Sequence, residues 1–467
     1  MARAAKDPIQ TLVVFGAGGD LSSRLLLPGL GSLLAASRGT RIRLIGVGVT
    51  PMTDADWRGA VAKAFSGTAS ELGTQVAGDA VWVQADVTEA EDLRRILAAA
   101  RGRTAIYFAL PPAVTEASCR RLSTLELPPG LVLALEKPFG TDLASARRLN
   151  RLLQTMVPEE QVFRVDHFLG KATVLNLLGL RFANRLFEPL LSAPNVERID
   201  IVVDERLALE GRAAYYDKAG ALTDMIQSHL LQVLALTTME PPSSLSSEDL
   251  RGAMAQVLRA TRPWRADGTA SRRARYTAGT IGSRKLPAYT AEEGVDRDRG
   301  TETLAELTVA IDTWRWAGVP VSLRSGKAIG GAVQEIVFTL RAVPHLPIGF
   351  DGPSRQAQLR IGMNPGGVSL DLITNGRGDP FDLEWDTLRA DFDPGELTAY
   401  GEVLAELLEG DPTLSVRGDV AEQCWRIVAP VLAAWRRNAV PLETYPAGSD
   451  GPRRWSTPIV AKAELPA

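Results

Sequence analysis

The stretch Thr11–Leu21, TLVVFGAGGDL, decides how the first part of this 467-residue chain folds. Its apolar run predicts a buried strand, and the glycines break that strand just before a helical pattern that continues towards Leu34. Backbone N–H groups at such a helix start can hold a phosphate, because glycine lets the phosphate approach closely. The spacing departs from G-x-G-x-x-G, since Leu21 takes the place of the last glycine. A tight strand–helix turn without a ligand is the alternative interpretation.

Further strand–helix units follow this first one. The expected strands are 43–47, 81–84, 105–109 and 131–135. Thr53 is placed to cap the helix after the second strand, and Thr141 the helix after the fifth. Repeated units of this length predict a parallel, doubly wound sheet of the Rossmann-like type.

The pattern changes after about Val162. Long helical stretches at 171–186 and 219–239 are joined by alternating strands such as 199–203 and 335–340. Alternation with one polar face indicates a large, mainly antiparallel sheet. We therefore predict an α/β plus α+β protein. A dinucleotide-binding Rossmann-like domain is expected at 1–163, and an α+β domain for substrate binding and oligomerisation at 164–467.

Bulk composition narrows the class of protein. A formal net charge of -3 gives no basis for a nucleic acid or an anionic membrane as partner. The two cysteines, Cys119 and Cys424, have no metal-ligand spacing and indicate a reducing compartment. Met1–Ile9 lacks the apolar core of a signal peptide, and no apolar run reaches membrane-spanning length. We expect a cytoplasmic protein without a metal site.

Two of the three histidines lie in blocks of charged residues. The block Arg164–Lys171, RVDHFLGK, places a carboxylate, an imidazole and an ammonium group within two helical turns. Asp224–His229, DMIQSH, forms the second block. Histidine is the side chain best suited to exchange a proton near neutral pH, so both blocks indicate chemistry.

Together with seven other stretches, the glycine loop and the first histidine block match the motifs of one family in order. The matching stretches are Gly16–Leu21 (GAGGDL), Ala109–Pro112 (ALPP), Glu136–Gly140 (EKPFG), Arg164–Lys171 (RVDHFLGK), Leu180–Arg185 (LRFANR), Tyr216–Asp224 (YDKAGALTD), Gln227–Gln232 (QSHLLQ), Trp314–Pro320 (WRWAGVP) and Arg324–Lys327 (RSGK). The chain resembles glucose-6-phosphate dehydrogenases over nearly its whole length, most of all their actinobacterial branch. The resemblance implies oxidation of D-glucose 6-phosphate to 6-phospho-D-glucono-1,5-lactone with hydride transfer to NAD(P), in the oxidative pentose phosphate pathway.

The resemblance assigns the catalytic roles to His229 and Asp166. His229 matches the proton acceptor, and Asp166 matches the carboxylate that orients and stabilises it. Oxidising a hemiacetal needs a base on the hydroxyl while hydride leaves, and a carboxylate behind an imidazole holds its tautomer. A core histidine satisfied by backbone groups is the alternative for His229.

The sugar phosphate is expected at His167 and Lys171, which match the family's phosphate-binding residues. Four positions apart, they would share one face if this stretch is helical, although a solvated basic pair is the alternative. Phe168 stands where relatives usually carry tyrosine, so we expect one hydroxyl contact to be missing.

The other substrate residues implied by the resemblance are Lys137, Glu205, Asp224 and Lys327. Lys137 matches a lysine between sugar and cofactor, and its bond to Pro138 resembles one that is cis in the family. Carboxylates suit a ligand with several hydroxyl donors. For Glu205 a solvated strand residue is the alternative. On an ideal α-helix Asp224 and His229 would diverge by roughly 140°.

The cofactor is expected to be NADP, with NAD as the alternative. Val49 stands where relatives that prefer NADP commonly carry arginine, which removes a bidentate phosphate partner. For Asp86 a helix N-cap is the alternative. The predicted cofactor contacts are Gly16, Gly18, Gly19, Asp20, Leu21, Thr50, Asp86, Val87, Pro111 and Lys137.

Two other functions stay open. A dehydrogenase of a related hexose or amino-sugar phosphate is motivated by Phe168 and by Ala332, which replaces a second lysine of many relatives. A non-catalytic regulator that senses sugar phosphate or dinucleotide belongs to another class. We expect a small-molecule substrate, no nucleic acid, no membrane, and a homodimer or homotetramer.

Overall fold

The computed structural model describes residues 8–36, 40–211, 213–352 and 355–456. The chain forms two compact units, and each is assembled from three stretches of sequence. The first unit comprises residues 1–175, 242–255 and 395–422, and the second comprises residues 176–241, 256–394 and 423–467. None of the helices in the described part is both long and apolar enough to cross a membrane.

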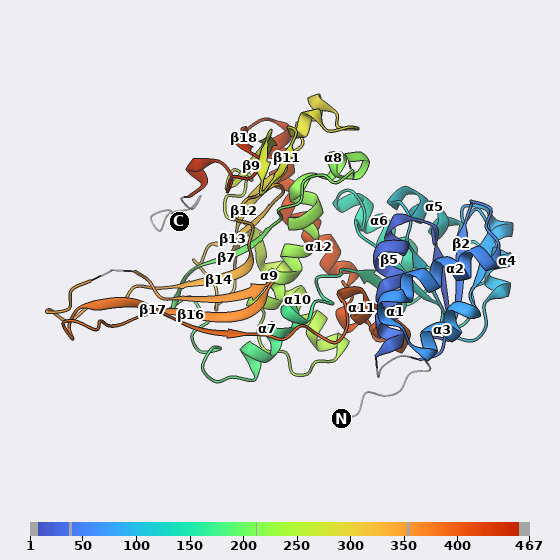
Figure 1. Ribbon diagram of the computed structural model, residues 1–467, viewed down its shortest axis with the longest axis horizontal. Helices are drawn as coiled ribbons and strands as arrows, with labels where there is room; N and C mark the ends of the chain where they lie inside the picture. The colour runs from blue at the N-terminus through green and yellow to red at the C-terminus, as the bar shows by residue number, and fades with distance from the viewer. Residues whose placement is uncertain (1–7, 37–39, 212, 353–354, 457–467) are drawn as a thin grey trace. The chain divides into compact units, whose positions relative to one another are not determined.

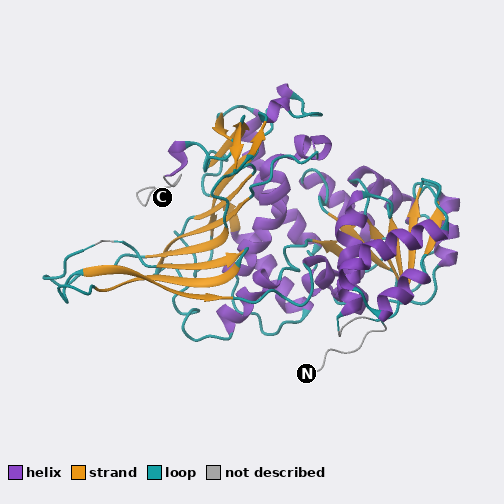
Figure 2. Ribbon diagram, in the orientation of Figure 1, coloured by secondary structure: helices purple, strands orange, loops and turns teal. Residues whose placement is uncertain are grey.

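The first unit contains a six-stranded sheet in the order β3-β2-β1-β4-β5-β6, and all its strand pairs are parallel. The strands are β1 (Thr11–Phe15), β2 (Arg43–Gly48), β3 (Val81–Gln84), β4 (Thr104–Phe108), β5 (Val132–Glu136) and β6 (Val162–Val165). Every residue of β1 and β4 is buried, as expected for central strands covered on both faces. The predicted doubly wound sheet is confirmed, and Figure 2 shows helices on both sides of it.

The helices of this unit follow the strands. They are η1 (Ser22–Leu26), α1 (Leu27–Ala35), α2 (Asp54–Phe65), α3 (Glu71–Gly78), α4 (Ala90–Ala99), α5 (Pro112–Leu122), α6 (Leu143–Gln154) and, from far along the chain, α11 (Ala399–Glu409). Thr53 caps α2 as predicted, in a capping box with Asp56. The predicted cap at Thr141 is wrong. The N-cap residue of α6 is Asp142, whose carboxylate accepts the Ser145 N–H at 2.7 Å.

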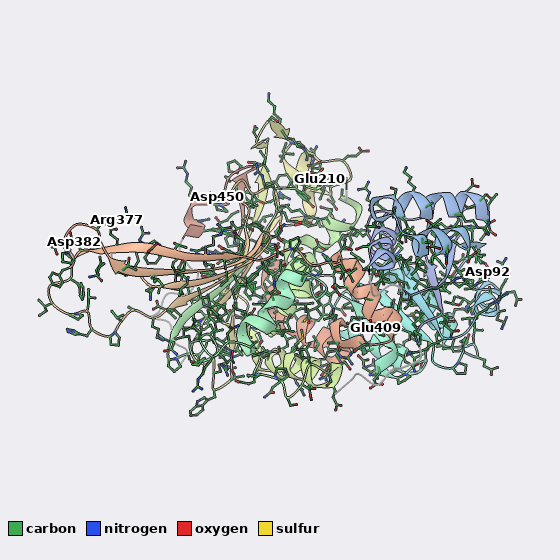
Figure 3. All side chains as sticks on the ribbon, turned by 60° about the horizontal axis from the view of Figure 1, so that its bottom comes forward. Asp92, Glu210, Arg377, Asp382, Glu409 and Asp450 are labelled. Carbon is green, nitrogen blue, oxygen red and sulfur yellow. The ribbon has the colours of Figure 1, made fainter. Side chains whose placement is uncertain are left out.

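The second unit contains a ten-stranded mixed sheet in the order β17-β16-β15-β14-β7-β13-β12-β9-β18, with β8 beside β12. Its strands are β7 (Val196–Asp204), β8 (Thr261–Pro263), β9 (Ser271–Thr277), β12 (Leu304–Ile311), β13 (Val321–Gly326), β14 (Gln334–Leu340), β15 (Gln358–Met363), β16 (Gly366–Asn375), β17 (Leu383–Asp391) and β18 (Leu442–Pro446). Only the β7–β13 and β9–β18 pairs of this sheet are parallel among the described strands, which confirms the mainly antiparallel prediction. Figure 3 shows Arg377 and Asp382 at the tip of the β16–β17 hairpin.

Further helices lie in the later part of the chain, and several of them have residues in both units. They are α7 (Ala172–Phe182), α8 (Ala213–Ala221), η4 (Leu222–Leu230), α9 (Leu231–Thr238), α10 (Ser247–Ala260) and α12 (Gly418–Arg436) (Figure 1). Of these, η4 packs against β12 and β13, and every residue of α9 is buried. The buried stretch η4–α9 therefore holds its side chains in fixed positions within the second unit.

Candidate active site

The glycine loop after β1 has the geometry of a phosphate cradle. Gly16 has a φ of +77°, and a Cβ there would lie 2.3 Å from the carbonyl oxygen of Ala109. Gly19 donates its N–H to Gly16 O at 3.0 Å, and the loop runs into η1 and α1. Gly18, Gly19 and Asp20 are exposed, so the start of the helix is open to a ligand. These residues fit the pyrophosphate of a dinucleotide.

We expect Gly16→Ala to damage this loop strongly. An alanine would combine strained backbone, which costs about 1–3 kcal/mol, with a clash against fixed main chain. The midpoint of thermal unfolding should fall, and the KM for the dinucleotide should rise at least roughly tenfold. Gly59→Ala is the matched control, since nothing lies within 4 Å of a Cβ at this position in α2. Wild-type cofactor binding by Gly16→Ala would contradict the cradle.

The other predicted cofactor residues lie at the carboxyl ends of neighbouring strands. Thr50 is exposed beyond β2, and Pro111 is the N-cap residue of α5. Asp86 does not cap a helix, because Glu89 is the N-cap of α4. Instead Asp86 closes a turn in which its carboxylate accepts the Thr88 N–H at 2.9 Å. The side chain of Val87 is buried, so only its backbone is available to a ligand.

The block after β6 is a series of turns, which makes the predicted helical spacing of His167 and Lys171 wrong. Gly170 N–H bonds His167 O at 3.2 Å, Lys171 N–H bonds Phe168 O at 3.2 Å, and α7 begins only at Ala172. These hydrogen bonds join residues three apart, so the side chains of the turns point in different directions from those of an α-helix. The two residues nevertheless come together, because both contact one ring.

That shared ring belongs to Phe168, which is buried. Lys171 Nζ lies 3.7 Å from its centroid, and the centroids of His167 and Phe168 are 5.1 Å apart. A cation over an aromatic face is attracted by the ring quadrupole. Phe168 thus holds the ammonium group of Lys171 beside the imidazole of His167, and both side chains remain partly exposed. The pair presents a local positive site in an acidic protein.

Buried groups fix the position of this block. The fully buried guanidinium of Arg164 donates to Glu159 at 2.7 Å and to Asn150 Oδ1 at 3.2 Å. The carboxylate of Asp166, also buried, accepts the Phe168 N–H at 2.9 Å. A Cβ at Gly170 would lie 2.3 Å from Ala399 O, so α11 packs directly on the turns.

Lys137 lies just beyond β5, and its bond to Pro138 is cis, as the resemblance implied. The preceding residue, Glu136, accepts hydrogen bonds from the hydroxyls of Tyr107 and Tyr400. Withdrawal of its carboxyl group from water raises the pKa of Glu136 to about 7, although the two tyrosines and Lys137 act in the opposite sense. A group that titrates near neutral pH therefore adjoins the predicted substrate lysine.

In the second unit, Asp224 and His229 lie on one π-helical segment, η4. Bonds from residue i to i+5, such as Leu231 N–H to Ile226 O, place residues five apart on successive turns. The divergence expected from an ideal α-helix is therefore wrong, and the two side chains lie one turn apart. His229 is buried, and Asp224 accepts the Tyr215 hydroxyl at 3.2 Å.

The start of η4 is held by a buried carboxyl group. Glu302 accepts the Leu222 N–H at 3.0 Å, and a Cβ at Gly220, where φ is +69°, would lie 2.3 Å from its carboxyl oxygen. Burial raises the pKa of Glu302 to about 7. Glu302 thus fixes the turn that precedes Asp224.

Glu205 and Lys327 form an ion pair, with Lys327 Nζ 2.6 Å from Glu205 Oε2. Glu205 follows the end of β7 and is partly buried, so the interpretation as a solvated strand residue is wrong. Lys327 follows β13, which pairs with β7, and its Nζ lies 5.2 Å from the ring of Tyr216. The sheet register therefore brings these two predicted residues together.

The predicted residues thus fall into one group on each unit. Asp166, His167, Lys171, Lys137 and the cofactor residues belong to the first unit. Glu205, Asp224, His229 and Lys327 belong to the second. Sequence reasoning missed Tyr400 and gave Glu136 no role, although both contact residues of the first group. A charged residue at the end of a buried strand was the available signal for Glu136, whereas no local pattern marks Tyr400.

Comparison with known proteins identifies relatives of this chain. Residues 13–176 match the family model "Glucose-6-phosphate dehydrogenase, NAD binding domain", and residues 178–464 match "Glucose-6-phosphate dehydrogenase, C-terminal domain". The glucose-6-phosphate 1-dehydrogenase of Gluconobacter oxydans is 38% identical over 469 residues, covering 95% of this chain and 94% of the relative. Glucose-6-phosphate 1-dehydrogenase 2 of Mycobacterium tuberculosis is 39% identical over 372 residues, covering 75% and 70%. Because both match to a similar degree, the actinobacterial placement stays a prediction.

Solved structures give the same result. The glucose-6-phosphate 1-dehydrogenase of Mycobacterium avium superposes with a TM-score of 0.84 at 33% identity, covering 96% of each chain. A glucose-6-phosphate dehydrogenase in complex with its substrate glucose 6-phosphate gives a TM-score of 0.86 at 27% identity, covering 97% of each chain.

Proposed function

The chain belongs to the glucose-6-phosphate dehydrogenase family, and on this premise we propose that it oxidises D-glucose 6-phosphate to 6-phospho-D-glucono-1,5-lactone. The observation that carries the proposal is the π-helical segment η4, which places Asp224 and His229 on successive turns. This arrangement supports His229 as a base and Asp224 as a hydroxyl acceptor that face the same sugar. The step would open the oxidative pentose phosphate pathway.

The proposal gives each group of residues a role. His167 and Lys171 hold the phosphate, and Glu205, Asp224 and Lys327 bind sugar hydroxyl groups, with Lys137 at the reacting end. His229 takes the proton of the anomeric hydroxyl, and the carboxylate of Asp166 offsets the charge that the imidazole gains. A bound NAD(P) would supply the hydride acceptor. Its pyrophosphate would lie on Gly16, Gly18, Gly19, Asp20 and Leu21, and the rest of the molecule on Thr50, Asp86, Val87 and Pro111.

A panel of sugar phosphates with each dinucleotide tests the proposal. Glucose 6-phosphate should give NAD(P)H formation with the highest kcat/KM. A higher kcat/KM with another hexose or an amino-sugar phosphate would favour that substrate instead. Binding of glucose 6-phosphate without any NAD(P)H formation would favour the regulator. We also propose that the protein is a homodimer or homotetramer. Its molar mass, measured by light scattering after size-exclusion chromatography, would distinguish these states from a monomer.

For the cofactor we propose NADP, with NAD as a second substrate. Val49 directly follows β2 and is 67% exposed, so an arginine there would be free to reach an adenosine 2′-phosphate. We expect Val49→Arg to raise the ratio of kcat/KM for NADP to that for NAD roughly tenfold, since one charge-assisted hydrogen bond contributes about 1.5–3 kcal/mol. Val49→Gln is the uncharged control. An unchanged ratio would mean that the 2′-phosphate binds elsewhere.

A further inference from the structure

Tyr400, on α11, lies face to face with the imidazole of His167. The two ring centroids are 5.8 Å apart, with an angle of 12° between the ring planes. Aromatic pairs make favourable contact at centroid separations of about 4.5–7 Å. Phe168 meets the same imidazole edge-on, so rings from two sides restrict how His167 can turn.

The hydroxyl of Tyr400 is tied to the end of β5. It donates to Glu136 Oε1 at 3.3 Å, and the hydroxyl of Tyr107 donates to the same oxygen. Glu136 directly precedes Lys137. One connected set of side chains therefore links the strand end that carries Lys137 with the imidazole of His167.

Tyr400 is itself held rigidly. Its side chain is 7% exposed, and it packs against α1, where a Cβ at Gly29 would lie 2.7 Å from the Tyr400 Cβ. Helix α11 also begins with a capped turn, because Thr398 accepts the Gly401 N–H at 3.1 Å. A ring fixed in this way can orient a partner that is only partly buried.

We propose that Tyr400 is a positioning residue that orients His167 for the phosphate of the substrate, and that Glu136 anchors Tyr400. The inference rests on the proposed function, because it names how one phosphate-binding residue is held. Tyr400 acts through His167 and does not itself touch the sugar phosphate.

The charge of Glu136 gives the arrangement a pH dependence. The groups that face this carboxyl are Tyr107, Tyr400, Lys137 and Asp166. Because its pKa is raised to about 7, Glu136 is neutral below that pH and gains a negative charge as the pH rises through it. A negative charge beside Lys137 and Asp166 opposes an anionic substrate. The KM for glucose 6-phosphate should therefore rise above pH 7 in the wild type, and less so in Glu136→Gln.

A double-mutant cycle tests the positioning role. Tyr400→Leu should raise the KM for glucose 6-phosphate roughly tenfold while leaving kcat and the KM for the dinucleotide within about twofold. Tyr400→Phe keeps the ring but loses the hydroxyl, and should give a smaller rise of about threefold. In a His167→Asn background, Tyr400→Leu should add nothing. A full additional tenfold rise there would overturn the inference.

Histidine-selective ¹⁵N labelling gives a second readout, because the chain has only three histidines. Tyr400→Phe and Tyr400→Leu should shift the ring signals of His167 and leave those of the exposed His345 in place. Unshifted His167 signals would refute the contact even if KM changed. The spectra need no turnover, so they test the inference separately from the proposed function, which fails if the wild type forms no NAD(P)H from glucose 6-phosphate.

Discussion

Replacing His229 by asparagine is expected to lower kcat by about 10² to 10⁴-fold, the range that positioned acid–base groups contribute. Asparagine keeps the size and polarity of the side chain but cannot accept the substrate proton. His229 is buried on η4, whereas the predicted phosphate-binding residues His167 and Lys171 lie on a different segment of the chain. The KM for glucose 6-phosphate should therefore stay within about threefold of the wild-type value.

The matched control for that change is His345→Asn. His345 is exposed between β14 and β15, so the same substitution there should leave kcat unchanged. Steady-state kinetics at saturating dinucleotide, together with thermal unfolding of each variant, provide the measurement. Wild-type turnover by His229→Asn would remove the base assignment.

Replacing Lys171 by alanine is expected to raise the KM for glucose 6-phosphate by about 10- to 100-fold. The loss corresponds to a charge-assisted hydrogen bond to phosphate, worth about 1.5–3 kcal/mol. The ammonium group lies over the ring of Phe168, and Lys171 remains partly exposed, so an anion can reach it from solvent. The effect of Lys171→Ala should shrink at high salt.

Two comparisons make the Lys171 result specific. Lys63→Ala removes the same charge from the exposed surface of α2 and should leave KM unchanged. Oxidation of unphosphorylated glucose should be equally slow in wild type and Lys171→Ala, because no phosphate is present to be held. A defect of the same size with glucose would show that Lys171 supports the fold rather than the phosphate.

The strands of the first unit could be predicted from sequence because each is a short apolar run bounded by glycine or polar residues. Burial on both faces erases alternation and leaves such runs. The glycine loop could be predicted equally well, since the φ of +77° at Gly16 is a conformation that glycine adopts at no steric cost.

Spacing arguments failed wherever the backbone left the ideal α-helix. His167 and Lys171 both contact Phe168 because the chain forms turns there, and Asp224 and His229 lie on successive turns of a π-helical segment. Both arguments assumed 3.6 residues per turn, and tertiary packing overrode that period. The sequence indicated candidate residues in these blocks, but it did not indicate the backbone geometry that positions them.

Contacts between distant segments were beyond any local pattern. Tyr400 reaches His167 only because α11 joins the first unit, and the sequence of an amphipathic helix does not show which elements it will pack against. The same holds for Glu302, whose carboxyl group holds the start of η4 from a separate stretch of chain. The roles of the site residues and the choice of dinucleotide stay predictions.

The position of α11 late in the sequence affects when the first unit can complete its packing during synthesis. The strands β1 to β6 emerge first, but the helix that packs on α1 is encoded only at 399–409. At synthesis rates of about 5–20 residues per second, the apolar side of α1 remains exposed for roughly tens of seconds before α11 is made. During that interval the nascent chain exposes the apolar side of α1, and the first unit reaches its final packing only after residues 399–409 have been synthesised.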